Sequence, residues 1–145
     1  MNTVRDVLSH KGTDVVSVSP DSTVYEALSV MNANNIGAVL VIDNDGEIAG
    51  ILSERDYARK VILMGKASKD TLVSEIMTRQ VAYIAPNNSV EEAMAIMSQR
   101  RCRHLPVLDN GTLCGIISIG DVVRAVIQDK DIRISQLERY ITSSL

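Results

Sequence analysis

The chain contains the same pattern twice. Residues 20–31 (PDSTVYEALSVM) return as residues 86–97 (PNNSVEEAMAIM), and residues 50–56 (GILSERD) return as residues 115–121 (GIISIGD). A repeat of this length is one supersecondary unit that cannot bury its apolar face alone. Two copies therefore predict a fold with pseudo-twofold symmetry and two equivalent clefts between its halves. We expect the function to lie in those clefts.

The charge and the aromatic content argue against nucleic acid as a partner. The 145 residues include 18 acidic and 15 basic side chains, which gives a net charge of −3. An interface with a phosphate backbone usually needs a strongly basic face. Phe and Trp are absent and Tyr occurs only 4 times, so the chain also lacks the aromatic side chains on which single-stranded bases stack.

The sequence favours a cytoplasmic protein with no membrane partner. The N-terminal residues show no basic start followed by a long apolar stretch, which a secretory signal needs. The best apolar run, residues 36–42, is too short to cross a bilayer. Cys102 and Cys114 are too few for a disulfide framework and are typical of a reducing compartment. Processing of a longer precursor stays open.

Each copy predicts the order strand, helix, strand, strand, helix. Residues 24–31 and 90–97 carry apolar side chains at helical spacing, and each run begins at a capping box, at residues 23–26 and 89–92. Asp-Gly and Asn-Gly pairs between apolar runs indicate two hairpins. The expected elements are helical turns at 3–9 and 72–78, extended segments at 15–19 and 81–85, strands at 38–42, 48–52, 105–108 and 113–117, and closing helices at 54–64 and 119–128.

The repeats divide the chain into four parts. A first unit comprises residues 1–64, a polar linker residues 65–71, a second unit residues 72–128 and a C-terminal helix residues 129–145. Within the tail, Ile134, Leu137 and Ile141 fall on one face of a helix that has no counterpart in the first copy. The sequence leaves open whether this helix extends a dimer contact or caps the core.

A serine stands three residues before an aspartate at the start of both closing helices, as Ser53 with Asp56 and as Ser118 with Asp121. One interpretation is a helix N-terminal box, in which the serine caps the helix and the acid lies at its positive end. The other is a ligand site. There the carboxylate accepts both hydrogens of a ribose diol, and the serine and helix N-terminus face a phosphate. The two interpretations are compatible.

The chain resembles a tandem pair of cystathionine-β-synthase (CBS) domains, also called a Bateman module. The resemblance covers residues 3 to about 128. It is carried by the motif Gly-hydrophobic-hydrophobic-Ser-x-x-Asp, which occurs twice, each time after a hairpin and at a helix start. Residues 53–57 and 118–124 are similar to small stand-alone CBS-pair proteins without a catalytic domain. The resemblance implies an α+β fold of two pseudo-twofold related CBS units, each β-α-β-β-α, packed sheet to sheet, with an additional C-terminal helix.

The resemblance also implies two nucleotide clefts, each built from both units. The ligand would be an adenosine nucleotide, AMP first, then ADP, ATP or a dinucleotide such as NAD(H), with a ribose held by Asp56 and by Asp121. The Asp56 cleft would contain Ser53, Arg55, Asp56, Tyr83, Asn88, Cys102, Arg103 and His104. The Asp121 cleft would contain Ser17, Ser22, Ile36, Gly37, Ala38, Ile116, Ser118, Gly120 and Asp121.

The two clefts would differ in charge. Residues 100–104 (RRCRH) would face the Asp56 cleft, and Arg55 would add another cation there, which suits phosphate. Small apolar groups would line the Asp121 cleft. We therefore expect the Asp56 cleft to prefer the more highly charged ligand. The arginines also fit a solvated helix end, where cations lie near the negative terminus of the helix.

Cys102 has two interpretations. Its place between two arginines favours a thiolate and hence reactivity. Its counterpart in the first copy is Ile36, which indicates a small apolar packing residue. We expect Cys114 to pack as well. His104 has no second ligand in view that would make a metal site.

These features favour a non-catalytic regulatory module of signal transduction, which binds an adenosine nucleotide and transmits its occupancy to a dimer or to an unidentified regulated protein. The alternative is a dimeric protein-interaction platform with vestigial clefts. An enzyme is disfavoured because the sequence shows no paired nucleophile and base, no metal cluster and no Walker-type loop. The resemblance implies a homodimer formed through the closing helices, with apolar faces at Tyr57, Val61 and Ile62 and at Val122, Val126 and Ile127.

Overall fold

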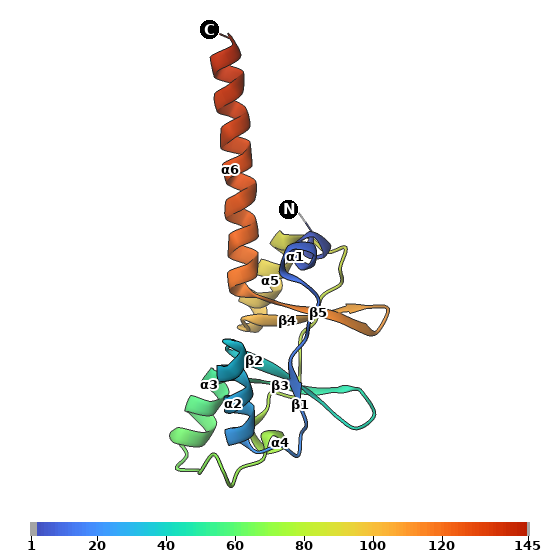
Figure 1. Ribbon diagram of the computed structural model, residues 1–145, viewed down its shortest axis with the longest axis vertical. Helices are drawn as coiled ribbons and strands as arrows, with labels where there is room; N and C mark the ends of the chain where they lie inside the picture. The colour runs from blue at the N-terminus through green and yellow to red at the C-terminus, as the bar shows by residue number, and fades with distance from the viewer. Residues whose placement is uncertain (1–2, 145) are drawn as a thin grey trace. The chain divides into compact units, whose positions relative to one another are not determined.

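The structure, a computed structural model, describes the backbone of residues 3–144 and the side chains of residues 3–131 and 134–139. The chain divides into two compact units (Figure 1). The central unit comprises Val15–Val81. The terminal unit combines the N-terminal segment, up to Asp14, with the chain from Ala82 onward.

The central unit is built on a three-stranded sheet of order β1-β2-β3. Strand β1 (Ser17–Val18) is parallel to β2 (Ala38–Ile42), which is antiparallel to β3 (Ile48–Ser53). Helix α2 (Val24–Asn34) joins β1 to β2. After β3 come α3 (Glu54–Tyr57), the π-helical turn η1 (Ala58–Ile62) and α4 (Val73–Ile76). Apolar side chains from α2, β2, β3, η1 and α4 form one core.

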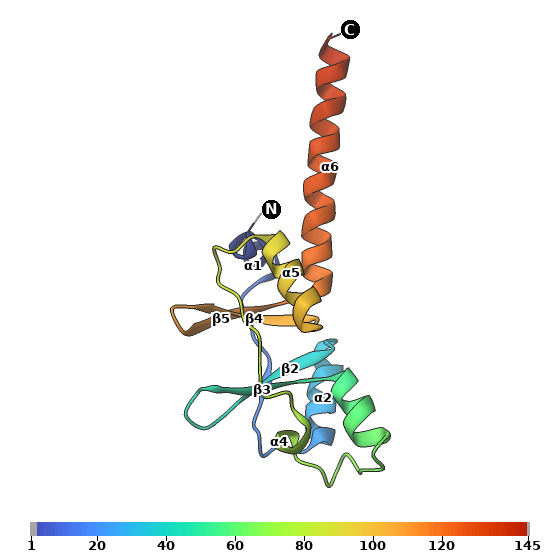
Figure 2. The same ribbon diagram turned by 180° about the vertical axis from the view of Figure 1, so that it is seen from behind.

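The terminal unit repeats this order around a hairpin. Its elements are α1 (Val4–Lys11), α5 (Val90–Arg100), β4 (His104–Asp109), β5 (Thr112–Ser118) and α6 (Ile119–Ser144). Strands β4 and β5 are antiparallel, and a single parallel bridge from Ile84 to Val107 lies in the expected extended segment. Helices α1 and α5 and the start of α6 lie on one face of the hairpin (Figure 2), and their apolar side chains form the core there.

The helical turn that opens each repeat packs with the strands of the other repeat. Helix α1 belongs to the terminal unit, where the Val4 N–H donates to the Asn88 carbonyl at 2.9 Å. Helix α4 belongs to the central unit, where the Val73 N–H donates to the Ser22 carbonyl at 2.8 Å. The compact units therefore have different boundaries from the sequence units expected at 1–64 and 72–128. The α+β class, with two similar units and a C-terminal helix, is confirmed.

The glycine of the repeated motif allows these exchanged segments to approach the hairpin strands closely. A Cβ on Gly50 would lie 2.7 Å from the Thr78 carbonyl oxygen and 2.9 Å from Met77 Sδ. A Cβ on Gly115 would lie 2.7 Å from Leu8 Cδ2. Glycine inside a strand often marks such a close approach. In both copies, therefore, the glycine that begins the motif has a packing role.

Side-chain caps fix the starts of the two long helices that precede the hairpins. The Glu26 N–H donates to Thr23 Oγ1 at 3.1 Å in α2, and the Glu92 N–H donates to Ser89 Oγ at 3.0 Å in α5. In α5 the Ser89 N–H also donates to the Glu92 carboxylate at 3.1 Å, and this bond is the main cause that lowers the pKa of Glu92. The predicted capping box is complete in α5, whereas in α2 only the bond to the Thr23 side chain is present.

The closing helices differ from the prediction. The helix expected at 54–64 is a short α-helix followed by the π-helical turn η1, in which the Leu63 N–H donates to the Ala58 carbonyl at 3.2 Å. The helices expected at 119–128 and in the tail form one uninterrupted helix, α6. Residues 121–144 contain no Gly or Pro, so no residue there breaks the helix. The side chain of Ile141, part of the expected tail face, lies outside the described residues.

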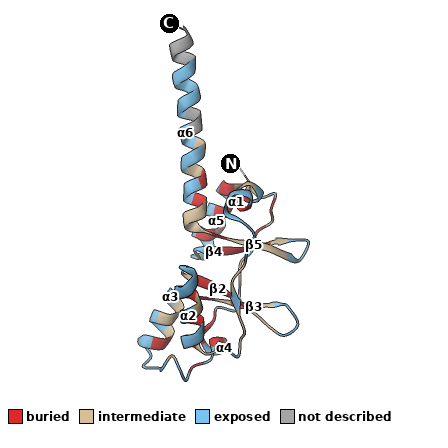
Figure 3. Ribbon diagram, viewed as in Figure 1, coloured by how far each residue is buried: buried red, intermediate tan, exposed pale blue. Residues whose placement is uncertain are grey.

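Two of the residues predicted to form apolar dimer faces are buried. Val61 and Val122 are buried in the cores of their own units and are 1% and 0% exposed, so they are not available for a dimer contact. Ile62 and Ile127, which were predicted for the same dimer faces, are exposed. Figure 3 shows buried residues in the first turns of α6 and exposed residues along its distal part.

We expect Gly50→Ala to destabilise the protein more than Gly115→Ala. At residue 50 the added Cβ would meet a backbone carbonyl, which cannot move without the exchanged segment. At residue 115 it would meet the end of a flexible leucine side chain. Overpacking of this kind costs about 1–3 kcal/mol. Urea unfolding of the two variants measures the difference, and equal losses would contradict the expectation.

Candidate functional site

The carboxylate of Asp121 is held at the junction of β5 and α6. The Ser118 N–H donates to Asp121 Oδ2 at 2.8 Å, and the Asp121 N–H donates to Ser118 Oγ at 3.2 Å. The two residues therefore cap the helix start reciprocally. The helix dipole also favours a negative charge in this first turn.

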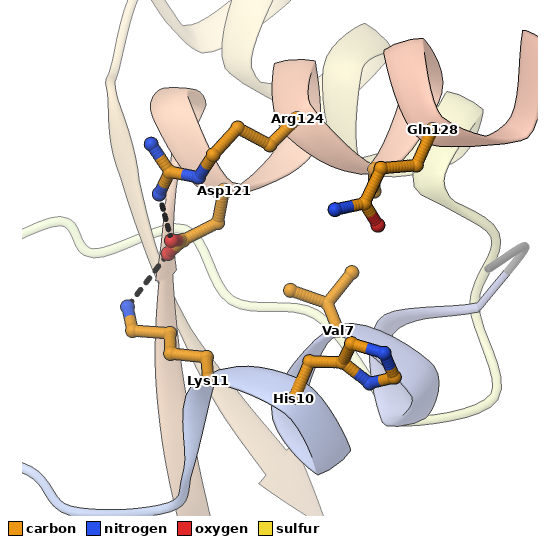
Figure 4. A pocket seen from close by; sticks show the side chains of 7 residues that line it. Val7, His10, Lys11, Asp121, Arg124 and Gln128 are labelled. Carbon is orange, nitrogen blue, oxygen red and sulfur yellow. Dashed lines mark hydrogen bonds and ion pairs between the residues drawn. The ribbon is translucent and has the colours of Figure 1, made fainter. Parts of the chain in front are cut away.

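Two cations bind the same carboxylate (Figure 4). Lys11 Nζ of α1 lies 2.6 Å from Oδ2, and Arg124 Nη2 lies 2.7 Å from Oδ1. The Asp121 side chain is 9% exposed. Its burial alone would raise the pKa of the carboxyl, but the hydrogen bond from Lys11, the bonds from Ser118 and the charge of Lys11 together hold the pKa below its usual value. We call Lys11, Ser118, Asp121 and Arg124 the Asp121 cluster.

A hollow of about 220 Å³ lies beside this cluster, between α1 and α6. Lys11, Asp121 and Arg124 lie at one end of it, and His10 and Gln128 lie at the other (Figure 4). The hollow is smaller than the sites that enclose drug-sized ligands, which measure roughly 300–1,000 Å³. Its lining residues are Val7, His10, Lys11, Asp121, Arg124, Ala125 and Gln128.

The carboxylate of Asp56 is held in a similar way at the junction of β3 and α3. The Ser53 N–H donates to Asp56 Oδ2 at 3.0 Å, and Ser53 Oγ lies 3.1 Å from the same oxygen. Thr78 Oγ1 donates to Oδ1 at 3.3 Å, and Lys60 Nζ lies 3.3 Å from that oxygen. The ion pair is longer than either pair of Asp121, and its lysine is 44% exposed. We call Ser53, Asp56, Lys60 and Thr78 the Asp56 cluster.

Backbone contacts bring two further predicted residues to the Asp56 cluster. The Glu54 N–H donates to the Gly37 carbonyl at 3.0 Å. Ala38 pairs with Ser53 across β2 and β3. We predicted Gly37 and Ala38 for the cleft of the other carboxylate, yet within the central unit they adjoin the serine of the Asp56 cluster.

The terminal unit shows the equivalent arrangement. The Ile119 N–H donates to the Arg103 carbonyl at 2.8 Å, and His104 pairs with Ser118 across β4 and β5. Arg103 and His104 therefore adjoin the serine of the Asp121 cluster, although we predicted them for the Asp56 cleft. Each predicted cleft combines residues of both units, and that combination stays a prediction.

The other predicted site residues have identifiable surroundings in their own units. Asn88 Oδ1 accepts from the Ala85 N–H at 2.9 Å, and Asn88 Nδ2 donates to the Glu92 carboxylate at 2.8 Å, so this side chain links the turn before α5 to the first turn of that helix. Tyr83 is exposed. The rest lie in β1 (Ser17), in the loop before α2 (Ser22), against the central core (Ile36), in α3 (Arg55), against the terminal core (Cys102), in β5 (Ile116) and in the first turn of α6 (Gly120).

Burial governs the titration of Cys102 and His104. Burial raises the pKa of the Cys102 thiol, and the opposing charge of Arg100 does not overcome it. Of the two interpretations of Cys102, this favours the apolar packing residue, and Cys102 packs against the terminal core. Burial and the charge of Lys11 lower the pKa of His104, which favours the neutral imidazole.

Four residues of the clusters were missed by the sequence analysis: Lys11, Lys60, Thr78 and Arg124. Lys60 stands four residues after Asp56, a spacing at which helical side chains meet, so it had a local signal. Lys11 and Thr78 reach their carboxylates only because the opening segments are exchanged. Arg124 ended a segment that supported the family resemblance, but it had no assigned role.

No helix in the described part of the chain is long and apolar enough to cross a membrane. The described residues also contain no group of three or more His, Cys, Asp or Glu side chains that could hold a metal ion.

Comparison with known proteins identifies both repeats. The sequence profile described as "CBS domain" matches residues 4–62 and 73–128. The CBS domain-containing protein CBSX3, mitochondrial, of Arabidopsis thaliana is 39% identical, and the alignment covers 96% of this chain and 71% of the relative. The CBS domain-containing protein YhcV of Bacillus subtilis is 37% identical, with 84% of each chain covered.

The fold also matches solved structures. A protein with CBS domains from Burkholderia ambifaria MC40-6, named for an inferred role in signal transduction, is 50% identical. The match covers 88% of this chain and 95% of that chain, with a TM-score of 0.84.

We expect Lys11→Met to lower the free energy of unfolding by about 1–2 kcal/mol at neutral pH, because it removes a charge-assisted hydrogen bond from a nearly buried carboxylate. The pKa of Asp121 is lower in the folded chain than in the unfolded chain. The ion pair therefore stabilises the fold fully at pH values above the unfolded-state pKa, and this stabilisation is lost as the pH falls through the folded-state pKa. The loss should therefore shrink in acid.

Urea unfolding at neutral pH and below about pH 3 measures this change. Lys60→Met is the matched control, because its ion pair is longer and its lysine more exposed, and we expect a smaller loss. A Lys11→Met loss that is the same at both pH values would show that the ion pair with Asp121 is not its cause.

Proposed function

The chain belongs to the CBS-domain family as a tandem pair of these domains. We propose that it is a non-catalytic regulatory module for adenosine nucleotides. Binding of AMP, ADP, ATP or NAD(H) would be transmitted to a second copy of the chain or to a regulated partner protein. The proposal extends to a homodimer in the cytoplasm that binds neither nucleic acid nor membranes.

The observation that supports nucleotide binding is a carboxylate geometry that occurs twice. Asp56 and Asp121 both stand where a strand ends in a helix, and a serine three residues earlier holds one carboxylate oxygen through its backbone N–H. A carboxylate fixed in this way can accept two hydrogen bonds from the vicinal hydroxyls of a ribose. Its orientation is set before a ligand arrives, which lowers the entropy cost of binding.

The cations around Asp121 suit the phosphates of the same ligand. A ribose that binds Asp121 would replace Lys11 or Arg124 on the carboxylate, and the released cation could then bind a phosphate oxygen. Asp56 has one longer ion pair with a lysine. We therefore propose that the Asp121 site takes the more highly charged ligand, which reverses the order expected from residues 100–104.

One observation favours the alternative, a protein-interaction platform with vestigial clefts. The Asp121 carboxylate is nearly buried and already accepts bonds from Ser118, Lys11 and Arg124. A carboxylate so well compensated could serve only to hold α1 against α6. Ligand binding therefore needs a direct test.

We expect an adenosine nucleotide to raise the melting temperature of the protein. At about 100 times its dissociation constant a ligand stabilises the native state by about 2.7 kcal/mol, which shifts the melting point of a chain of this size by several degrees. AMP, ADP, ATP and NAD(H) are tested separately by differential scanning fluorimetry. Asp121→Asn and Asp56→Asn, which keep an acceptor for the serine N–H, assign the shift to a site.

The outcomes separate the functions. A shift that either variant abolishes supports the nucleotide module. No shift with any of these nucleotides favours the interaction platform. Turnover of ATP or NAD(H) would make the protein an enzyme and would overturn the proposal.

We expect Arg124→Gln to weaken AMP binding by roughly tenfold while leaving adenosine binding nearly unchanged, because the lost cation would bind phosphate and not ribose. Titration calorimetry of both ligands in the Asp56→Asn background isolates the Asp121 site. Lys60→Gln in the same background is the matched control, because it removes a cation from the Asp56 cluster. It should leave the affinities for AMP and for adenosine unchanged. Equal losses for AMP and adenosine would place Arg124 elsewhere than at the phosphate.

A further inference from the structure

The side chains that the structure describes in the distal half of α6 cover no core. Val122 and Ala125, in its first two turns, are buried in the terminal core. Beyond them the helix continues without a break to Ser144 and extends past the other elements of its unit (Figures 1 and 2). The described side chains from Lys130 to Asp131 and from Ile134 to Arg139 are all exposed. The described part of this segment therefore does not cap the core, one of the two roles that the sequence left open.

Exposed apolar side chains nevertheless follow a regular spacing along α6. Val123, Ile127, Ile134 and Leu137 are 42%, 51%, 53% and 60% exposed. Together with Lys130 they recur at alternating intervals of four and three residues, the heptad spacing of a coiled coil, with Ile127 and Ile134 at position a and the other three at position d. We call these five residues the α6 seam.

The α6 seam lies on the side of the helix away from the terminal core. At about 100° per residue, Ala125 is roughly 160° from both Val123 and Ile127 around the helix axis. One face of α6 is therefore used by its own unit, and the five seam residues, four of them apolar, are exposed on the other side of the helix. A helix whose exposed apolar residues keep the 3.5-residue period is suited to pairing with another helix.

We infer that the α6 seam pairs with the α6 seam of a second copy of this chain as a parallel two-stranded coiled coil. The inference adds a specific surface and orientation to the homodimer of the proposed function. Isoleucine at position a with leucine at position d favours two parallel strands. The seam has this composition at Ile127, Ile134 and Leu137.

The charges of the seam favour a second copy in this orientation over another occupant. Lys130 is the one polar residue among the five seam positions, and Asp131 follows it at position e. In a parallel, in-register pair, position e of one helix borders position d of the other, so each Lys130 ammonium can leave the seam and pair with Asp131 of the second copy. This pairing of Lys130 with Asp131 forms twice, once from each copy, as a twofold-symmetric contact requires.

An antiparallel pair lacks this complementarity. There, e positions of one helix face e positions of the other, and the e positions along the seam are Arg124, Asp131 and Glu138. Arg124 pairs with Asp121 in its own unit, and the other two are acidic. Opposed like charges disfavour that orientation. A single polar core residue such as Lys130 also fixes register and strand number at some cost in stability.

The test compares two double variants of the full chain. Ile134→Asp with Leu137→Asp places two charges in the seam, and Ser135→Asp with Gln136→Asp places the same charges at the neighbouring b and c positions, outside the seam. We expect the first pair to weaken self-association at least tenfold in sedimentation equilibrium and the second to leave it unchanged. Far-UV circular dichroism checks that both chains remain folded. A monomeric wild type, or self-association that the seam variant retains, overturns the inference.

Disulfide cross-linking tests the orientation. In a parallel pair, Lys130→Cys and Leu137→Cys each meet the same residue of the second copy and should cross-link on mild oxidation. Ser135→Cys, outside the seam, and the wild type, with its partly buried Cys102 and Cys114, give the background. Cross-linking at only one of the two positions would contradict a parallel, in-register pair, and cross-linking at neither would exclude the seam.

The melting shift with AMP is measured on the seam variant as well. A shift that persists while the dimer dissociates supports the seam and leaves the nucleotide site intact. A wild type that dimerises through the seam but shows no shift with any adenosine nucleotide supports this inference and contradicts the nucleotide function alone.

Discussion

The close contact between each exchanged opening segment and the glycine of the repeated motif underlies both the cores and the clusters. Because residues 50 and 115 have no Cβ, the segments that carry Thr78 and Leu8 approach the strands directly. The same approach brings Thr78 to the Asp56 carboxylate and Lys11 to the Asp121 carboxylate. One packing constraint thus closes each core and supplies a partner for each acid. This explains why the glycine and the aspartate occur in one motif.

The two copies have diverged in charge rather than in geometry. Both serine–aspartate boxes keep the bond from the serine N–H to the carboxylate. At this carboxylate the exchanged segment contributes a neutral hydroxyl in one copy and an ammonium in the other. The guanidinium of Arg124 strengthens the difference. Equivalent backbones thus place two acids in unequal electrostatic surroundings, the condition under which two similar sites acquire different ligand preferences.

Local patterns in the sequence predicted the elements of this fold well, because helix caps, hairpin turns and apolar spacing act over a few residues. The complete capping box at Ser89 and Glu92 is one example. What depends on contacts between distant segments was not predictable. Lys11 lies far from Asp121 in the sequence, and no local signal joins them. For the same reason the sequence left two interpretations of Cys102 open, since its burial comes from packing on the terminal core.

The unbroken course of α6 has a mechanical consequence. Asp121 stands in the first turn of a helix of 26 residues, which is about 39 Å long. The backbone hydrogen bonds of an α-helix keep it stiff, so it behaves as a lever. A tilt of about 5° at the first turn would move the far end by roughly 3 Å, given that length. If a rearrangement of Lys11 and Arg124 around this carboxylate tilted the helix, the helix length would enlarge that movement to about 3 Å at the far end.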